Sequence, residues 1–327
     1  QGVLALENSF NRVGLDHVLL VKVASTAVIS FLMGLSKDQA LDALSQAFVD
    51  GQSLRTYRHA PNAGPRKSWA AGDATSRAMN LVLITQKGQI GYPSAITAPT
   101  WGFQDVLFKG NSLSLPQEFS SYVMENVLFK ISFPAEFHAQ TAVEAAVKLH
   151  PEIINRLEEI EKIIITTHES AIRIISKEGK LNNPADRDHC IQYMTAIGLL
   201  KGDLVAEDYE DNVANDPRVD SLRSKMFIEE NKNYSMDYLA PDKRSIANEL
   251  QIIFKDGSST EKVEVEYPIG HRRRREEGIP LLVSKFEENL KTQFSVNRVE
   301  KIMKICEDQN NLESLKVTDF MELFIKE

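Results

Sequence analysis

Residues 55–73 read RTYRHAPNAGPRKSWAAGD, and the rest of the chain is organised around this stretch. Between Arg55 and Arg77 there are five Lys or Arg residues against a single acid, in a chain whose net charge is −8. An acidic protein that collects cations in one segment is expected to bind an anion there. The alternative interpretation is a solvated basic loop.

The first half of this stretch is rich in Pro, Asn and Gly, which predicts a loop. From Ser68 the residues are small and predict a turn, after which a helix is expected over residues 74–87, ending at Gly88. A cationic loop before a helix N-terminus can bind an anion through three features: the side-chain charges, the backbone N–H groups and the positive end of the helix dipole. The small residues favour a packed, concave site, in which Arg58, His59 and Arg66 are candidate substrate contacts.

Length and composition are typical of a globular protein. The chain has 327 residues, of which 43% are hydrophobic and 26% charged, and this length suits one large or two moderate domains. The negative net charge argues against nucleic acid as the main partner. Cys190 and Cys306 are the only cysteines, so no disulfide framework, zinc site or iron–sulfur cluster is expected. Residues 17–35 are apolar but interrupted by Lys and Ser, which indicates a core helix rather than a membrane span.

Further along the chain, hydrophobic periodicity and turn residues predict the remaining elements. Ser36 and Gln39 have the spacing of a capping box, at the start of a helix that ends near Gly51. Further helices are expected over residues 140–149, 187–200 and 280–326. Strands are expected over residues 127–133, 161–168, 171–176, 249–254 and 262–267, the last two forming a hairpin around Asp256-Gly257.

The order of these elements is helices, then a mixed α+β middle, then helices again. We therefore predict a mainly α protein with an α+β part. Residues 1–126 are expected to form a large helical domain and residues 127–275 a smaller α+β lid. Residues 276–327 are expected to return to the helical domain.

Several polar residues are candidates for acid–base chemistry. His17 follows Asp16 at the head of the apolar helix, where the neutral imidazole is favoured, although a structural histidine is equally consistent with the pattern. Lys67 precedes the small residues and is either a desolvated lysine, a fixed charge for a carboxylate or a surface lysine. Tyr193 is expected one turn from His189 on one helix face, as an active-site or a core residue.

A second group of candidates surrounds Pro134, whose fixed bend allows Lys130, Glu136 and His138 to converge on one cavity. Histidine is suited to proton transfer because its pKa lies near neutrality, although His138 could equally be a capping residue. Residues 272–275 are four consecutive arginines followed by two glutamates, which indicates ion pairing, with His271 as a weaker candidate for carboxylate contact.

Five blocks of the sequence together resemble the MmgE/PrpD family, and the resemblance runs along the whole chain. The blocks are RTYRHAPNAGPRKSWAAGDATSRA (55–78), GYPSAITAPTWGFQDVLFKG (91–110), SYVMENVLFKISFPAEFHAQTAVEAA (121–146), NNPADRDHCIQYM (182–194) and VEYPIGHRRRREEGIP (265–280). The resemblance implies a large helical domain, a smaller α+β lid, an active site between them and a homodimer. It implies elimination of water from the tricarboxylate 2-methylcitrate, without metal or cofactor. Decarboxylation of cis-aconitate, known in another branch, and non-catalytic anion binding are the alternatives.

The resemblance also implies roles for individual residues. Lys67, His17 and Tyr193 match positions that line or reach the substrate pocket in the family. The decarboxylase branch has a lysine and a histidine flanking Phe-Pro-Ala, whereas this chain has Glu136 at the histidine position and His138 two residues later. Which of these two side chains faces the substrate therefore stays open.

The chain begins at Gln1, within sequence that resembles the middle of a domain. We therefore expect it to be a fragment or processed product, which lacks an upstream pocket segment that the family carries. The pathway implied by the resemblance is propionate breakdown, which runs in the mitochondrial matrix of fungi and in the bacterial cytoplasm.

Overall fold

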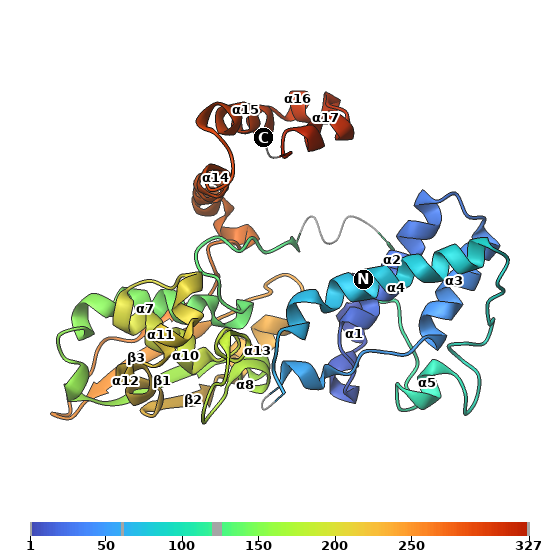
Figure 1. The fold of residues 1–327 in the computed structure, drawn as a ribbon. Helices are drawn as coiled ribbons and strands as arrows, with labels where there is room; N and C mark the ends of the chain where they lie inside the picture. The colour runs from blue at the N-terminus through green and yellow to red at the C-terminus, as the bar shows by residue number, and fades with distance from the viewer. Residues whose placement is uncertain (1, 60–61, 120–125, 326–327) are drawn as a thin grey trace. The chain divides into compact units, whose positions relative to one another are not determined.

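Helix α2 (Val18–Leu32) is the central helix of the first of two compact units, and it confirms the core helix predicted from the apolar run. The computed structural model describes residues 2–59, 62–119 and 126–325. Helix α2 contacts α3 (Lys37–Val49) and α4 (Arg66–Gln86) (Figure 1). The predicted capping box begins α3: Gln39 N–H donates to Ser36 Oγ over 3.2 Å, and Ser36 N–H donates to Gln39 Oε1 over 3.0 Å.

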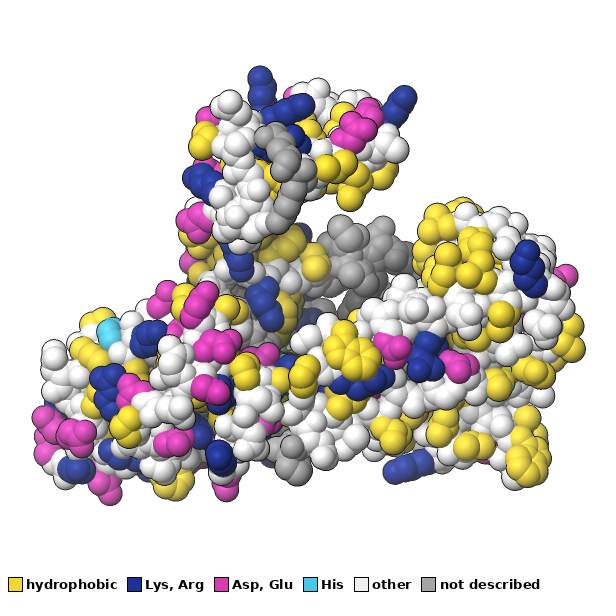
Figure 2. All heavy atoms as spheres, in the orientation of Figure 1, with side chains coloured by type: hydrophobic (Ala, Val, Ile, Leu, Met, Phe, Trp, Pro, Cys, Tyr) yellow, Lys and Arg dark blue, Asp and Glu magenta, His cyan; other side chains and the backbone are white. Residues whose placement is uncertain are grey.

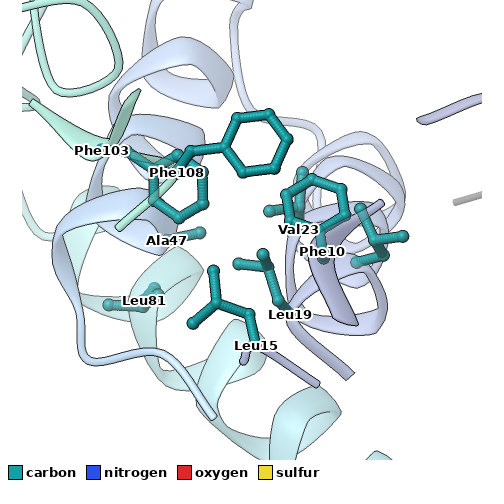
Figure 3. Packing of buried hydrophobic residues seen from close by; sticks show 9 residues of the cluster. Phe10, Leu15, Leu19, Val23, Ala47, Leu81, Phe103 and Phe108 are labelled. Carbon is teal, nitrogen blue, oxygen red and sulfur yellow. The ribbon is translucent and has the colours of Figure 1, made fainter. Parts of the chain in front are cut away.

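The core of this unit joins residues that are far apart in the sequence (Figure 3). Its buried members are Phe10, Leu15, Leu19, Leu20, Val23, Ala47, Leu81, Phe103 and Phe108. The rings of Phe10 and Phe108 stack with their centroids 5.1 Å apart. Burying one large apolar side chain contributes roughly 1.5–3 kcal/mol, so tertiary packing rather than helix propensity holds α2, α3 and α4 together.

Helix α4 begins at Arg66, eight residues before the predicted start, so the prediction of a turn after Ser68 is wrong. Pro65 precedes the helix with a φ of −59°, which is already helical. Ala70 and Ala74 are one turn apart and pack against Val18 of α2. Ala70 and Ala74 therefore form a stripe at which two helices pack, and the small residues do not form a concave turn.

The first unit, called here the helical unit, comprises residues 1–126, 173–194 and 206–220. Besides α2, α3 and α4, its described elements are α1 (Gly2–Glu7), η1 (Phe10–Val13), η2 (Arg55–Arg58), α5 (Phe103–Val106), α9 (Pro184–Arg187), η5 (Ala206–Tyr209) and α11 (Asp211–Ala214). Residues 60–61 of the predicted cationic loop lie outside the described residues.

Hydrophobic side chains gather over the helical unit at the right of Figure 2, whereas charges of both signs are interspersed at the left of that view. The most exposed large apolar side chains of this unit are Phe31, Leu32, Ile90, Trp101 and Phe119, with 71–84% of their surface accessible. Next to α3 lies an apolar pocket of about 700 Å³, lined by residues such as Leu41, Phe48 and Leu115. This unit therefore exposes several large apolar side chains and has an apolar pocket.

The second unit, called here the sheet unit, comprises residues 127–172, 195–205 and 221–327 and contains a four-stranded sheet of order β2-β1-β3-β4. Its strands are β1 (Ile160–Thr167), β2 (Met226–Glu230), β3 (Asn248–Phe254) and β4 (Val263–Val265). β1 pairs parallel with β2 and antiparallel with β3, and β3 and β4 form the predicted hairpin. Gly257 has a φ of +85° in its turn, which explains the need for glycine there.

Two predicted strands are not strands. Residues 171–176 fall largely within helix α8 (Glu169–Ile175), whose first amides are bound by side chains: Glu169 N–H donates to Ser235 Oγ and Ala171 N–H to His168 Nδ1. Residues 127–133 form no strand, and Lys285 Nζ donates to two of the carbonyls that a sheet would pair, those of Lys130 and Ile131. In both segments, side chains bind backbone groups that would otherwise pair with a neighbouring strand.

The helix predicted over residues 187–200 is interrupted. α9 ends at Arg187 and α10 (Ile191–Lys201) begins four residues later, so Asp188 and His189 lie in the link between them. The strand β2 was not predicted, because its five residues show no clear alternation. The other helices are α7 (Gln140–Ile153), η3 (Phe137–Ala139), η4 (Leu157–Glu159), α12 (Pro217–Arg223), α13 (Lys232–Leu239) and η6 (Arg272–Arg274).

The C-terminal residues are helical, as predicted, in α14 (Arg275–Lys291), α15 (Val296–Glu307), α16 (Gln309–Ser314) and α17 (Val317–Glu322). They have a small core of their own, made of Leu290, Val299, Ile302 and Leu323. The predicted boundaries of the domains, including the return of residues 276–327 to the helical domain, stay predictions. In the part of the chain that the structure describes, no helix has both the length and the apolar character needed to cross a bilayer.

We expect Gly270→Ala to destabilise the sheet unit by roughly 3 kcal/mol, the cost of a badly overpacked site. A Cβ at this position would lie 1.5 Å from the carbonyl oxygen of Phe129, so the backbone would have to move. Urea unfolding measures the change. The control is Gly72→Ala within α4, where a Cβ meets no atom within 4 Å and a gain of roughly 0.5–1 kcal/mol is expected. A stability of Gly270→Ala equal to or above that of the wild type would contradict the geometry.

Candidate active site

A buried carboxylate, Asp16, organises the cationic segment in the helical unit. Asp16 has no exposed surface and accepts from Arg58 Nε over 2.6 Å and from the Val18 N–H over 3.0 Å. Arg55 lies 3.6 Å from the same carboxylate. Burial alone would raise the pKa of Asp16, but the hydrogen bond from Arg58, the charge that His17 carries when it is protonated and the hydrogen bond from the Val18 N–H lower it, so Asp16 stays ionised. Sequence reasoning missed this carboxylate, although it directly precedes a candidate histidine.

His17 heads α2, as predicted, and 53% of its side chain is exposed. Its Nδ1 lies 3.5 Å from Asp16 Oδ1. Partial burial lowers the pKa of His17 against the opposing effect of Asp16, and the positive charges of Arg58 and Arg55 lower it further. His17 is therefore a neutral, accessible imidazole near pH 7, which is the form that a general base needs.

Lys67, in the first turn of α4, is held by the link between α9 and α10. Its ammonium donates to the carboxylate of Asp188, to His189 Nδ1 over 2.8 Å and to the Ala185 carbonyl over 2.8 Å. Only 9% of the Lys67 side chain is exposed. Burial lowers the pKa of Lys67 against the effect of Asp188. Because an ammonium has three donors, Lys67 is fully hydrogen-bonded in this state.

The structure brings two further cations to the predicted cationic segment, Arg173 and Lys177. Lys177 Nζ lies 3.3 Å from Asp186 Oδ1, and its side chain is 8% exposed. Burial, and then the charges of Arg55, Lys177 and Arg173, lower the pKa of the exposed His59, so these groups share one region. Sequence reasoning missed both cations because Arg173 lies within, and Lys177 directly after, the isoleucine-rich segment that resembled a strand.

In total, five cations and three carboxylates meet in this region of the helical unit. The cations are Arg55, Arg58, Lys67, Arg173 and Lys177, and the carboxylates are Asp16, Asp186 and Asp188. The excess positive charge is suited to an anion that carries more than one carboxylate.

The other residues of this unit that were predicted to contact substrate are bound to neighbouring residues of the protein. Arg66 stacks on the ring of Trp69, 4.4 Å from its centroid, and pairs with Asp73 over 3.2 Å. Tyr193 is 2% exposed, and its hydroxyl donates to the carbonyl of Asp208. The prediction that Tyr193 and His189 share a helix face is wrong, because His189 precedes the first residue of α10.

In the sheet unit, Glu136 and His138 form one hydrogen-bonded group, so the two alternatives for this position are directly joined. Glu136 accepts from the backbone N–H of His138, and its oxygens lie 2.7 and 2.8 Å from His138 Nδ1. Nε2 of His138 lies 3.1 Å from the hydroxyl of Tyr238. The ring of His168 stacks on that of Tyr238, with centroids 4.5 Å apart.

His168 and Tyr238 were not singled out by sequence reasoning, because neither belongs to a recognisable motif. His168 has no exposed surface and follows β1, where Ala171 N–H donates to its Nδ1 over 3.3 Å. Burial, followed by the charge of His138, lowers its pKa to about 3. His168 is thus a neutral imidazole that packs against the group containing His138.

Lys130 and His271 are also placed in the sheet unit. Lys130 Nζ lies 5.0 Å from the centroid of the Phe137 ring, beside the residues predicted to converge with it. His271 is 2% exposed, and its Nδ1 accepts from the backbone N–H of Arg273 over 3.2 Å. Burial, with the charges of Arg272 and Arg273, lowers the pKa of His271 to about 4. These contacts are those of a residue that caps η6.

The predicted ion pairing of residues 272–275 is confirmed for Arg274, which binds Glu144 over 2.9 Å and Glu277 over 2.8 Å. Arg272 and Arg273 both donate to the carbonyl of Asp242. Among the residues that the structure describes, no group of three or more His, Cys, Asp or Glu side chains is arranged to bind a metal ion.

Comparison with known proteins finds family sequence over most of the chain. Residues 1–116 match the family model described as the MmgE/PrpD N-terminal domain, and residues 133–310 match the MmgE/PrpD C-terminal domain. A 2-methylcitrate dehydratase of Escherichia coli K12 is 59% identical over 99% of this chain and 68% of its own length. A mitochondrial 2-methylcitrate dehydratase of Yarrowia lipolytica is 57% identical over 100% of this chain and 63% of its own length. A probable 2-methylcitrate dehydratase of Saccharomyces cerevisiae is 57% identical, with 99% and 64% covered.

We predict that His168 makes stability fall in mild acid. An unfolded histidine has a pKa of about 6.5, whereas that of His168 is about 3 in the folded state, so the unfolded chain takes up a proton first. The free energy of unfolding is therefore highest above about pH 6.5. Between about pH 6.5 and 3 it falls by about 1.4 kcal/mol per pH unit because of His168.

Urea unfolding at pH 7.5 and 5 measures this effect. In His168→Asn, the Asn oxygen replaces Nδ1 as the acceptor for Ala171 N–H but does not titrate. The variant should lose less stability than the wild type between the two pH values. Equal losses in the two proteins would contradict the prediction.

Proposed function

Because the chain belongs to the MmgE/PrpD family, we propose that it is a hydro-lyase that removes water from 2-methylcitrate to give 2-methyl-cis-aconitate. The observation that carries the proposal is the group of five cations in the helical unit, combined with 57–59% identity to relatives named for this activity. We propose that it acts in propionate breakdown as a homodimer. Its compartment would be the mitochondrial matrix in a fungus or the cytoplasm in a bacterium.

The substrate carries three carboxylates, and the cations provide partners for them. Arg58 is already oriented by Asp16, and Lys177 by Asp186. Binding of an anion therefore does not have to cost the conformational entropy of ordering these two side chains. Lys67 is fully hydrogen-bonded, so its role is to add positive charge and to fix Asp188 and His189. Arg58, His59 and Lys177 are the groups that we propose contact carboxylate, with Arg66, His189 and His271 as further candidates.

Dehydration requires a base for the proton beside a carboxylate and an acid for the departing hydroxyl. We propose His17 as the base, since it is neutral and half exposed beside the cations. The cations also stabilise the negative charge that develops on the carboxylate when the proton leaves. We assign the acid to the group containing His138, with Glu136 as its orienting carboxylate. Lys130 and Tyr193 stay candidates from the family resemblance.

We expect Lys177→Met to weaken binding of tricarballylate, an unreactive tricarboxylate, about 10–100-fold, which corresponds to a charge-assisted hydrogen bond of roughly 1.5–3 kcal/mol. Isothermal titration calorimetry measures the dissociation constant without requiring turnover. Lys180→Met removes the same charge from an exposed residue three positions away and should have little effect. Equal affinities in the two variants would exclude Lys177 from the anion site.

We also expect turnover to survive exhaustive chelation. The proposed chemistry uses side-chain acids and bases, and the two cysteines, Cys190 and Cys306, cannot supply a cluster. The assay follows the ultraviolet absorbance of the unsaturated product before and after treatment with EDTA, with metal analysis of the same sample. Activity that is lost and then restored by iron or a divalent cation would overturn the mechanism.

A further inference from the structure

The proton positions in the Glu136–His138–Tyr238 group follow from its geometry. A carboxylate only accepts hydrogen bonds, and both oxygens of Glu136 lie within 2.8 Å of His138 Nδ1. Nδ1 therefore carries a proton and donates a hydrogen bond to Glu136. In the neutral imidazole this leaves Nε2 as an acceptor, and the hydroxyl of Tyr238, 3.1 Å away, is its donor.

Both ring nitrogens of His138 are thus occupied within the protein. His138 is also shielded, with 12% of its side chain exposed, and its partner Glu136 is 14% exposed. Asn248 Nδ2 donates to the backbone carbonyl of His138 over 2.8 Å, which holds the residue in place from strand β3. A substrate would have to displace Tyr238 or Glu136 before it could reach an imidazole nitrogen directly.

Tyr238 is held in turn by its ring. Its ring lies nearly parallel to that of His168, at an interplanar angle of 11°, and the imidazole of His168 lies 5.3 Å from that of His138. The aromatic stack fixes the phenol ring from one side while the hydroxyl meets His138. Tyr238 comes from helix α13 and is only partly buried.

We propose that Tyr238 is the acid that gives its proton to the departing hydroxyl and that His138 is a positioning residue, which reprotonates Tyr238 and is itself oriented by Glu136. This inference rests on the proposed function. His138 then does not touch the substrate: it is hydrogen-bonded to Tyr238, and Tyr238 is hydrogen-bonded to the departing hydroxyl.

As the carbon–oxygen bond breaks, its electron pair stays on the hydroxyl oxygen, which takes the Tyr238 proton and leaves as water. In the reacting state His138 is protonated on both nitrogens, so Nε2–H donates to the Tyr238 oxygen and the phenol proton is directed to the substrate. Nε2–H then passes its proton to the Tyr238 oxygen, and His138 becomes neutral with its remaining proton on Nδ1, hydrogen-bonded to Glu136. The proton taken from carbon by the base returns to His138 through solvent, which restores the enzyme.

Tyr238→Phe separates this relay from direct catalysis by His138, because the two give opposite results. The relay predicts that kcat falls at least about 10²-fold, the usual contribution of a general acid, with little change in KM. Direct catalysis predicts that kcat is kept or rises, since removing the hydroxyl uncovers Nε2. The phenylalanine keeps the ring that stacks on His168, so the fold is preserved.

Two controls sharpen the test. Tyr234→Phe removes the same atom from the same helix, where the hydroxyl bonds to Glu264, and should leave kcat unchanged. The double variant Tyr238→Phe with His138→Gln should be no slower than the slower single variant, because residues that act as one unit are not additive. Independent losses that multiply would overturn the relay.

Nitrogen-15 spectra of the histidine rings test the geometry even if the protein does not act on 2-methylcitrate. Neutral His138 should be protonated at Nδ1, and its Nε2 signal should shift in Tyr238→Phe but not in Tyr234→Phe. A neutral His138 protonated at Nε2, or an Nε2 signal that does not respond to Tyr238→Phe, would overturn the inference. An inactive wild type with the expected spectra would instead reject the proposed reaction and, with it, the role of Tyr238 as the acid for that reaction.

Discussion

The arrangement of the helical unit depends on one buried ammonium, that of Lys67. Its partners lie on the link between α9 and α10, and Asp188 is 121 positions away in the sequence. Removing one member of a buried pair leaves a charge without compensation, at a cost on the order of 3 kcal/mol. The same contact holds the segment that contains Lys177 against the segment that contains Arg58. Together with the hydrogen bond from Asn183 Nδ2 to the carbonyl of Ala63, this ion pair brings together the cations that we propose bind substrate.

The sheet unit solves a different problem, which is to keep an imidazole in one tautomer. Glu136 holds the proton on one nitrogen and Tyr238 meets the other, while buried His168 adds no competing charge because it stays neutral. Charge compensation is therefore local here, whereas the region around Arg58 in the helical unit brings five cations together with three carboxylates. The two units supply different chemistry: one is suited to holding an anion and the other to moving a proton.

Local patterns in the sequence predicted local structure well. The capping box at Ser36 and the hairpin around Gly257 depend on residues a few positions apart, and both are present. The cations near Arg58 could be found because they lie close together in the sequence. The family resemblance supplied the fold class. Tyr238, 100 positions from His138, could not be found, because tertiary packing alone makes them neighbours. The strand pattern of residues 171–176 was misleading because side chains from His168 and from α13 bind the first amides of α8.

The path of the chain has a consequence for synthesis on the ribosome. The two sequence domains end and begin between residues 116 and 133, yet the helical unit is completed only by residues 173–194 and 206–220. When residues 1–126 have left the ribosome, Lys67 still lacks Asp188 and the carbonyl of Ala185. Its ammonium stays hydrated until residue 188 has emerged, so the helical unit reaches its final arrangement only after much of the second sequence domain has been made.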